Sequence, residues 1–199
     1  MKTSISTILS VAAFTLGIAT LVTSCGGKTE TSSSGISPQN MADALHAVME
    51  SDRTVYTKQV VNRLQNEEKV IKASEHWKDE KALPLPAQMF RMGAEMVAEK
   101  KKGFTYALLS EWPINKQNFP KTEVEKAGLA HIVKNVGQNY YAEETLGGKK
   151  YFTAVYPDTA IAAACVKCHN NHDDSPRTDF VEGDVMGGVV IRIPLATSN

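Results

Sequence analysis

Residues 140–157 read YYAEETLGGKKYFTAVYP, and this stretch decides the fold class. Two runs rich in aromatic, Thr and Val residues flank the pair Gly147 and Gly148, which is the composition of two strands joined by a tight turn. Strands joined by so short a turn run antiparallel, because a parallel pair needs a long crossover connection. The stretch therefore predicts a β-hairpin and favours an antiparallel sheet over a doubly wound parallel sheet.

The segments around the hairpin supply helices and two further strands. Apolar residues recur at helical spacing in two long segments, and Thr122 and Glu125 have the spacing of a capping box. The predicted elements are helices from 41 to about 80, from 86 to about 103 and from 122 to about 135, and strands at 104–110 and 185–195. The prediction is an α+β domain over residues 41–199, an antiparallel sheet with flanking helices.

The segment directly after the hairpin carries a chemical motif. It reads Cys165, Val166, Lys167, Cys168, His169. The pattern Cys-x-x-Cys-His is typical of covalent haem c attachment, in which two thioethers form to the porphyrin vinyl groups and the adjacent His reaches the iron. The motif predicts one covalent haem c, with Cys165 and Cys168 as the attachment residues and His169 as the proximal iron ligand.

Two other chemistries use cysteines at this spacing. A zinc site can use both cysteines together with His169 and His172, but His169 adjoins Cys168, which crowds a tetrahedral shell. A thioredoxin-like redox motif opens a helix inside a βαβ pattern, and the segment around Cys165 follows a hairpin instead. The haem interpretation fits every fixed position, provided that the protein is exported.

The N-terminus predicts export. Residues 1–24 have a positive start at Lys2 and an apolar core, which is typical of a signal peptide and is too short for a membrane span. The core closes on Val22, Thr23, Ser24 and Cys25, which resembles the lipobox of bacterial lipoproteins; an ordinary secretory peptide with an incidental cysteine is the alternative. Residues 25–40 read as a flexible tether. We expect a lipid on Cys25 to anchor the domain to a bacterial membrane facing the periplasm, and Gly26 after it favours the outer membrane.

The composition argues against two classes of function. Lys and Arg together number 22 and so do Asp and Glu, so the chain offers no basic surface that would indicate a nucleic-acid partner. The sequence has no nucleophile paired with a base, and no two carboxylates at a spacing that indicates acid–base catalysis. We therefore expect neither nucleic-acid binding nor an enzyme.

Beyond the haem motif, the chain resembles a family of single-haem c-type domains with a PAS-like fold. The family was formerly a domain of unknown function, and it includes a cyanobacterial haem protein and the periplasmic sensor regions of some histidine kinases. The segments that carry the resemblance are SDRTVYTKQVVNRL (51–64), FTYALLSEWPINKQNFP (104–120), GGKKYFTAVYPDTAIAAACVKCH (147–169) and GDVMGGVVIRIPL (183–195). The resemblance implies a five-stranded antiparallel sheet flanked by helices, a covalent haem and a redox or sensory role. It also implies that Arg53 and Tyr56 line the haem pocket or contact the propionates.

The second axial ligand of the iron stays open. The cyanobacterial member of the family has a His/Cys axial pair, but all three cysteines of this chain are assigned to attachment or anchoring. The candidates, of which at most one can serve, are His46, His131, Met49, Met89, Met92 and Met96. His76 lies in a polar run, and His172 is too near His169 in sequence to reach the opposite side of the iron. A site without a second protein ligand is the remaining alternative.

Two classes of function remain. The first is a membrane-anchored cytochrome-like protein for electron transfer or redox response outside the cytoplasm, which acts on an unidentified redox partner. The alternative is a haem-based gas or redox sensor that acts through a partner protein. The chain stops at IPLATSN, whereas the kinase relatives continue into an output domain. This favours electron transfer or a partner-dependent sensor.

Overall fold

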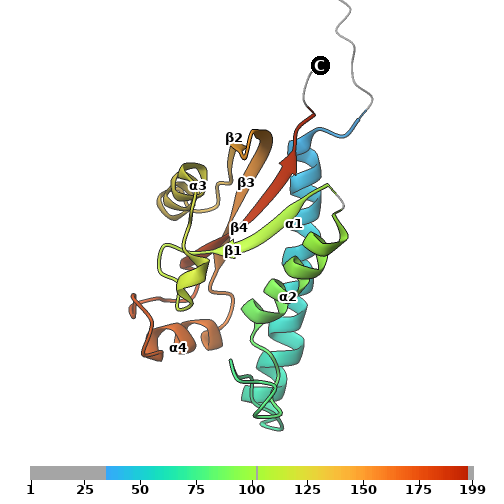
Figure 1. Cartoon of the computed structure of the whole chain (residues 1–199). Helices are drawn as coiled ribbons and strands as arrows, with labels where there is room; N and C mark the ends of the chain where they lie inside the picture. Colours follow the sequence, from blue (N-terminus) through green and yellow to red (C-terminus); the bar gives the residue numbers. More distant parts are fainter. Residues whose placement is uncertain (1–34, 102, 197–199) are drawn as a thin grey trace, which may run out of the picture. The chain divides into compact units, whose positions relative to one another are not determined.

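A computed structural model describes residues 35–101 and 103–196 (Figure 1). The predicted signal peptide, Cys25 and most of the predicted tether lie outside the described residues. In chain order the elements are the helix α1 (Pro38–Val55), the π-helix η1 (Tyr56–Glu67), α2 (Pro86–Lys100), β1 (Thr105–Leu109), the short 3₁₀ helix η2 (Lys116–Asn118), α3 (Glu123–Lys134), β2 (Tyr140–Leu146), β3 (Lys149–Thr159), α4 (Ala163–Asn171) and β4 (Val185–Pro194). The α+β class is confirmed.

The strands form one antiparallel sheet in the order β1-β4-β3-β2. The predicted hairpin is β2 and β3, with Leu146 opposite Lys149 across the turn. Gly147 and Gly148 both have positive φ, at 56° and 78°, as the turn of a two-residue hairpin of the I′ type requires. The last strand, β4, lies between β1 and β3 and joins the hairpin to the rest of the sheet.

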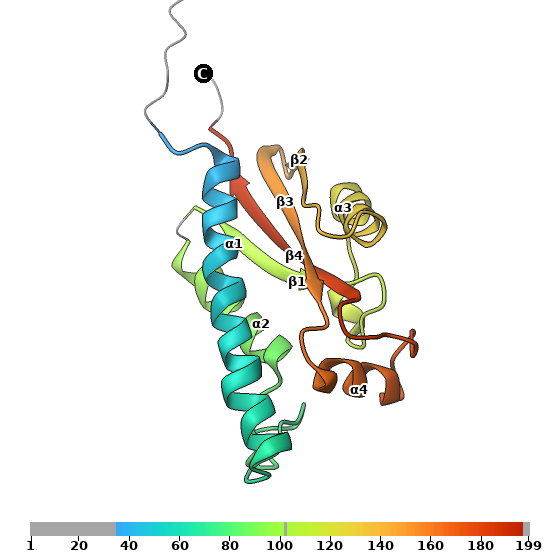
Figure 2. The same ribbon diagram turned by 180° about the vertical axis from the view of Figure 1, so that it is seen from behind.

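Helices cover both faces of the sheet. Side chains alternate along β3, so Tyr156 packs with Ala42 of α1 and Phe90 of α2, while Val155 packs with Leu129 of α3. Figures 1 and 2 show α1 and α2 on one side of the sheet and α3 on the other. The predicted capping box of α3 is present, since Thr122 accepts a hydrogen bond from the Glu125 N–H and Glu125 accepts one from the Thr122 N–H.

A buried charge network ties α3 to the sheet. Arg192 of β4 donates to Glu125 of α3 at 2.6 Å and to Glu144 of β2 at 2.7 Å. Burial alone would raise the pKa of Glu144, but hydrogen bonds from Thr153 and Arg192 hold that pKa below its usual value. The guanidinium therefore satisfies both carboxylates and links three elements that are far apart in sequence.

The first helical segment ends earlier than predicted. Helical structure stops at Glu67 instead of continuing to about Glu80. The second part of this helical segment, η1, is a π-helix. The Glu68 N–H closes its last turn by donating to the Arg63 carbonyl. Lys69 then takes a positive φ of 56°, which cannot continue a helix. Beyond Glu67 the segment no longer presents a packed apolar face, since Val70 is 67% exposed.

The five-stranded sheet that the resemblance implied is wrong for the described residues, which form four strands. Between η1 and α2 the chain makes only an isolated bridge, from Ala73 to Leu83. This segment, residues 68–85, has eight charged residues among eighteen and lacks the apolar alternation that a strand needs to pack one face on the core. Within residues 35–101 and 103–196, no helix is both long and apolar enough to span a bilayer.

Replacing Gly188 with alanine is expected to destabilise the domain. A Cβ at this position of β4 would lie 2.9 Å from side-chain atoms of Ile132 and Leu129 and 3.0 Å from Val155. Overpacking of this kind costs about 1–3 kcal/mol. Urea unfolding should show the loss, whereas Gly35→Ala, where no atom lies within 4 Å of the added carbon, should unfold as the parent does. Equal midpoints for Gly188→Ala and the parent would contradict the packing described between α3 and the sheet.

Candidate functional site

The Cys-x-x-Cys-His motif lies on α4, directly after β3 leaves the sheet. Cys165 and Cys168 stand one turn apart on this helix, and His169 stands one turn after Cys165, so the three side chains share one side of it. Both thiols are unpaired; Cys165 is half-buried and Cys168 is exposed. Burial raises the pKa of the half-buried Cys165 thiol, so this thiol is not an activated thiolate. The arrangement offers two thiols and an imidazole to one bound group.

The His169 imidazole is held in a partly buried position. Its ring meets Phe180 edge-to-face, with 5.9 Å between the ring centroids. Its Nδ1 is buried and has no hydrogen-bond partner among the described residues. Burial lowers the pKa of His169, which favours the neutral imidazole that a metal ion requires.

The loop after α4 fixes Phe180 beside this imidazole. Asn170 donates its side-chain N–H to the Phe180 carbonyl at 2.9 Å and accepts the Phe180 N–H at 3.0 Å. The Arg177 guanidinium lies 4.2 Å from the centre of the Phe180 ring and 4.8 Å from that of Trp112. Sequence reasoning missed Phe180 and Asn170, because their roles depend on a loop that folds back on α4.

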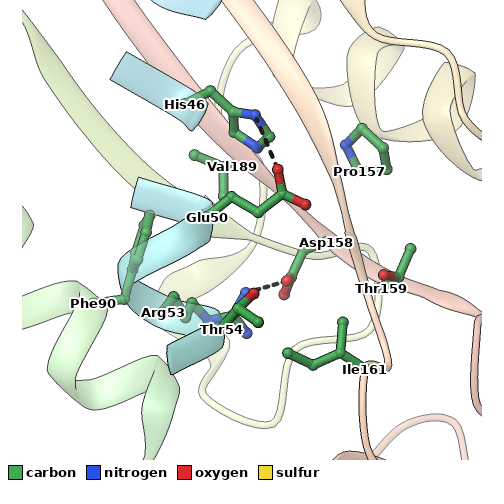
Figure 3. A pocket seen from close by; sticks show the side chains of 10 residues that line it. All are labelled: His46, Glu50, Arg53, Thr54, Phe90, Pro157, Asp158, Thr159, Ile161 and Val189. Carbon is green, nitrogen blue, oxygen red and sulfur yellow. Dashed lines mark hydrogen bonds and ion pairs between the residues drawn. The ribbon is translucent and has the colours of Figure 1, made fainter. Parts of the chain in front are cut away.

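A buried ion pair lies beside the motif. Arg53 near the end of α1 pairs with Asp158 near the end of β3, and their side chains are only 21% and 14% exposed (Figure 3). Burial alone would lower the pKa of Arg53, but Asp158 raises that pKa above its usual value. The charges of Arg53 and Asp158 both act on Cys165 and on His169. Asp158 was not among the predicted site residues, since it is 105 positions from Arg53 in the chain.

The Nε of Arg53 is also buried without a hydrogen-bond partner. This nitrogen and His169 Nδ1 are the two such side-chain atoms in the part of the chain that the structure describes. Buried polar atoms without partners are rare in folded proteins and indicate a bound group or water that completes them. The charge of Arg53 acts on His169, so the two groups lie in one region of the fold, and a bound group is expected there.

Tyr56, which the resemblance implies is a pocket residue together with Arg53, contacts another segment of the chain. Its hydroxyl donates to the Pro84 carbonyl at 2.8 Å, in the segment that leads into α2. Tyr56 therefore fastens η1 to the start of α2, and it is not among the residues around the ion pair.

His46 lies next to the ion pair, in a cavity of about 30 Å³ that Arg53, Asp158 and Ile161 also line (Figure 3). The His46 ring stacks on Tyr156 with 3.9 Å between centroids, and burial lowers its pKa. A cavity of this size accommodates one or two water molecules and not a porphyrin. His46 is therefore packed against the sheet.

The other candidate axial ligands are spread over three helices. His131 lies on α3, on the opposite face of the sheet from α1, with its ring 5.5 Å from that of Tyr140. Met49 packs into the core beneath α1, and Met89 and Met92 are half-buried on α2. Met96 of α2 is 57% exposed. The structure does not gather these side chains around His169.

A groove of about 320 Å³ separates α4 from the last turn of η1. Its lining consists of Gln65, Asn66, Ala164, Lys167, Cys168, Asn171 and His172. His172, which the zinc alternative requires, lies 3.7 Å from the Glu75 carboxylate. Across residues 35–101 and 103–196 no three His, Cys, Asp or Glu side chains converge as a metal site would need.

Comparisons with known proteins give the family of the chain and a similar fold. A comparison with curated proteins gave no match. Among solved structures, the chain is similar to the cyanobacterial haem protein Tll0287, with a TM-score of 0.53 and 13% sequence identity over 82% of this chain and 100% of that one. At this identity the likeness establishes the fold alone. The model of the Tll0287-like family matches residues 35–194, which is most of the chain, and the chain therefore belongs to the Tll0287-like family.

Proposed function

We propose that this chain is a monohaem c-type protein that carries out electron transfer or redox response outside the cytoplasm, on a PAS-like α+β domain. Cys165 and Cys168 hold the haem through thioethers, and His169 is its proximal ligand. The observation that carries the proposal is that His169 of the motif has a buried Nδ1 without a partner, on the helix that also presents two unpaired thiols. The charge of Arg53, whose buried Nε is also without a partner, acts on this imidazole. The family to which the chain belongs includes a haem protein, and this supports the same cofactor.

The residues present fit a haem chemically. The thiols are unpaired and lie one turn apart, as the attachment motif needs. The Nε–H of Arg53 has no partner, and a haem propionate is a carboxylate that accepts hydrogen bonds from such a donor. A bound haem supplies a one-electron couple at its iron, and its potential depends on axial ligands, burial and nearby charge.

The chain's own residues have separate tasks in this proposal. Phe180 holds the His169 ring, and Asn170 holds Phe180. Asp158 neutralises Arg53, so the site carries a balanced pair of charges and not an isolated buried cation. The proposed role is redox and not catalytic, since these side chains position and shield the bound group and none is arranged as a nucleophile with its base.

Acid–acetone extraction of the full-length protein, produced in a bacterium that attaches haem c, tests the proposal. Thioether bonds resist this treatment, so the colour is expected to stay with the precipitated protein. Haem that passes into the organic phase would show that it is not covalently attached, and a colourless protein would show that haem is not the cofactor.

Replacing Cys25 with serine is expected to release the protein from the membrane. The proposal includes a lipid at Cys25, and each buried acyl methylene contributes about 0.8 kcal/mol of membrane affinity, so two or three chains hold a domain firmly. Fractionation should place the parent with membranes and the variant in the soluble fraction or as an unprocessed precursor. Identical fractionation of the two would refute the lipid anchor, and the haem content of both would show that the domain itself is unaffected.

A further inference from the structure

The start of α1 and the helix α4 lie at opposite ends of the sheet. Early in α1, Asp43 accepts a hydrogen bond from the Tyr141 hydroxyl at 2.8 Å, whereas Arg53 near the end of α1 pairs with Asp158 near the end of β3. Because β3 continues from Asp158 into α4, α1 runs from the β2–β3 turn toward α4. Figures 1 and 2 show the start of α1 and the β2–β3 turn at one end, and α4 at the other.

Four exposed lysines from two separate segments lie at the end of the sheet where α1 starts. They are Lys100 and Lys101 at the end of α2, and Lys149 and Lys150 at the start of β3. The sheet brings both segments to one end. Thr105, just after the first pair, lies opposite Arg192 of β4, and the Leu195 N–H after β4 donates to the Lys150 carbonyl at 2.9 Å. The balanced composition of the chain conceals this basic end, because its lysines are far apart in sequence.

The charge of this basic end is not neutralised within the part of the chain that the structure describes. The lysine ion pairs of residues 35–101 and 103–196 are Lys72–Glu80 and Lys126–Glu123, and neither includes the four lysines. The exposed, unpaired carboxylates near the four lysines in sequence are those of Glu99 and Glu143. Two carboxylates against four lysines leave the end with a surplus of positive charge, which is available to an anionic partner.

We propose that this basic end docks on the anionic headgroups of a membrane surface, so that α4 and its motif face away from the membrane. This inference rests on the proposed function, because the proposed lipid on Cys25 keeps the domain at the membrane. The lipid alone does not set the orientation, since residues 26–37 separate it from α1. Lysines within a Debye length of an anionic surface, about 10 Å at 0.1 M salt, are attracted to it and set the orientation.

The docked orientation determines where a redox partner can meet the motif. The strand β3 has 11 residues and rises about 3.3 Å per residue, so α4 lies on the order of 30 Å from the basic end. The partner therefore reaches α4 from the aqueous phase and not from within the same membrane.

Acylation of lysines in the full-length lipidated protein tests the inference. The protein is added to preformed vesicles of phosphatidylcholine, either alone or in a two-to-one mixture with phosphatidylglycerol, and labelling is read by mass spectrometry. In the anionic vesicles the four lysines should be labelled about fivefold more slowly, the factor that one lysine contact with an anionic surface provides. Exposed Lys116 of η2 and Lys167 of α4 should be labelled equally in both vesicles. The protection should disappear in about 1 M salt, where the Debye length is about 3 Å.

The other outcomes separate this inference from the proposed function. Equal labelling of the four lysines in both vesicles, with the protein still bound to them, would overturn the docked orientation and leave the lipid anchor standing. Protection of Lys167 together with the four lysines would also overturn it. Protein that associates with neither kind of vesicle would remove the anchor and this inference with it, while the haem content would still test the cofactor.

A charge-removing variant shows whether the lysines themselves set the orientation. Lys149→Gln combined with Lys150→Gln should abolish the protection of Lys100 and Lys101, because half of the positive charge of the basic end is gone. Lys116→Gln is the matched control, since it removes an exposed lysine beyond the far end of β1 and should leave the protection unchanged. Full protection of Lys100 and Lys101 in the double variant would overturn docking through the basic end.

Discussion

Replacing both Cys165 and Cys168 with alanine is expected to abolish covalent haem completely. In the proposed function each thiol supplies one of the two thioethers, and the third cysteine, Cys25, carries the lipid anchor. The double variant should show no haem absorbance on a denaturing gel. Each single variant should retain some haem through its remaining thioether.

The Cys25→Ser variant is the matched control for this experiment, because it removes a cysteine without touching α4. It should keep the parent's haem content per mole of protein. Covalent haem in the double alanine variant would contradict the attachment described here, and loss of haem in Cys25→Ser would mean that Cys25 takes part in attachment.

Replacing Asp158 with asparagine is expected to cost about 3 kcal/mol of stability. The change leaves the Arg53 guanidinium partly buried without its counter-charge, and breaking a buried pair from one side typically costs about 3–5 kcal/mol. The lower figure applies because both side chains keep some exposure. Denaturant unfolding of the parent and the variant measures the difference.

The chain offers two controls for the Asp158 prediction. Glu68→Gln breaks the exposed pair with Arg63, in which both side chains are nearly half exposed, and should cost less than about 1 kcal/mol. The double change Arg53→Met with Asp158→Leu removes both charges and should recover most of the stability that Asp158→Asn loses. If Asp158→Asn and Glu68→Gln have equal effects, the Arg53–Asp158 pair is not a buried structural element.

Local patterns in the sequence predicted the local parts of the structure. The hairpin followed from Gly147 and Gly148 between two alternating runs, and the start of α3 followed from Thr122 and Glu125. The C-x-x-C-H spacing likewise places the side chains of its two Cys and one His on one side of a helix. Each of these depends on residues within a few positions of one another, where periodicity and capping rules apply.

The parts that sequence reasoning missed depend on contacts between distant segments. Asp158 stands at the end of a strand, and nothing near it in sequence indicates that Arg53 is its partner. Phe180 reads as an ordinary loop residue until Asn170 and Arg177 fold that loop onto α4. The early end of η1 was missed because Lys69, which ends the helical segment with a positive φ, is neither Gly nor Pro and gives no stop signal in the sequence.

The central claim is that one haem is bound through both cysteines of α4, and tryptic digestion followed by mass spectrometry tests it most directly. Trypsin cleaves after Lys150, Lys167 and Arg177, so it separates the peptide 151–167, which contains Cys165, from the peptide 168–177, which contains Cys168. If both thioethers are present, the two peptides stay joined and are recovered as one species with the combined mass of both and one haem. Recovery of the two peptides as separate, haem-free species from the full-length coloured protein would contradict the account.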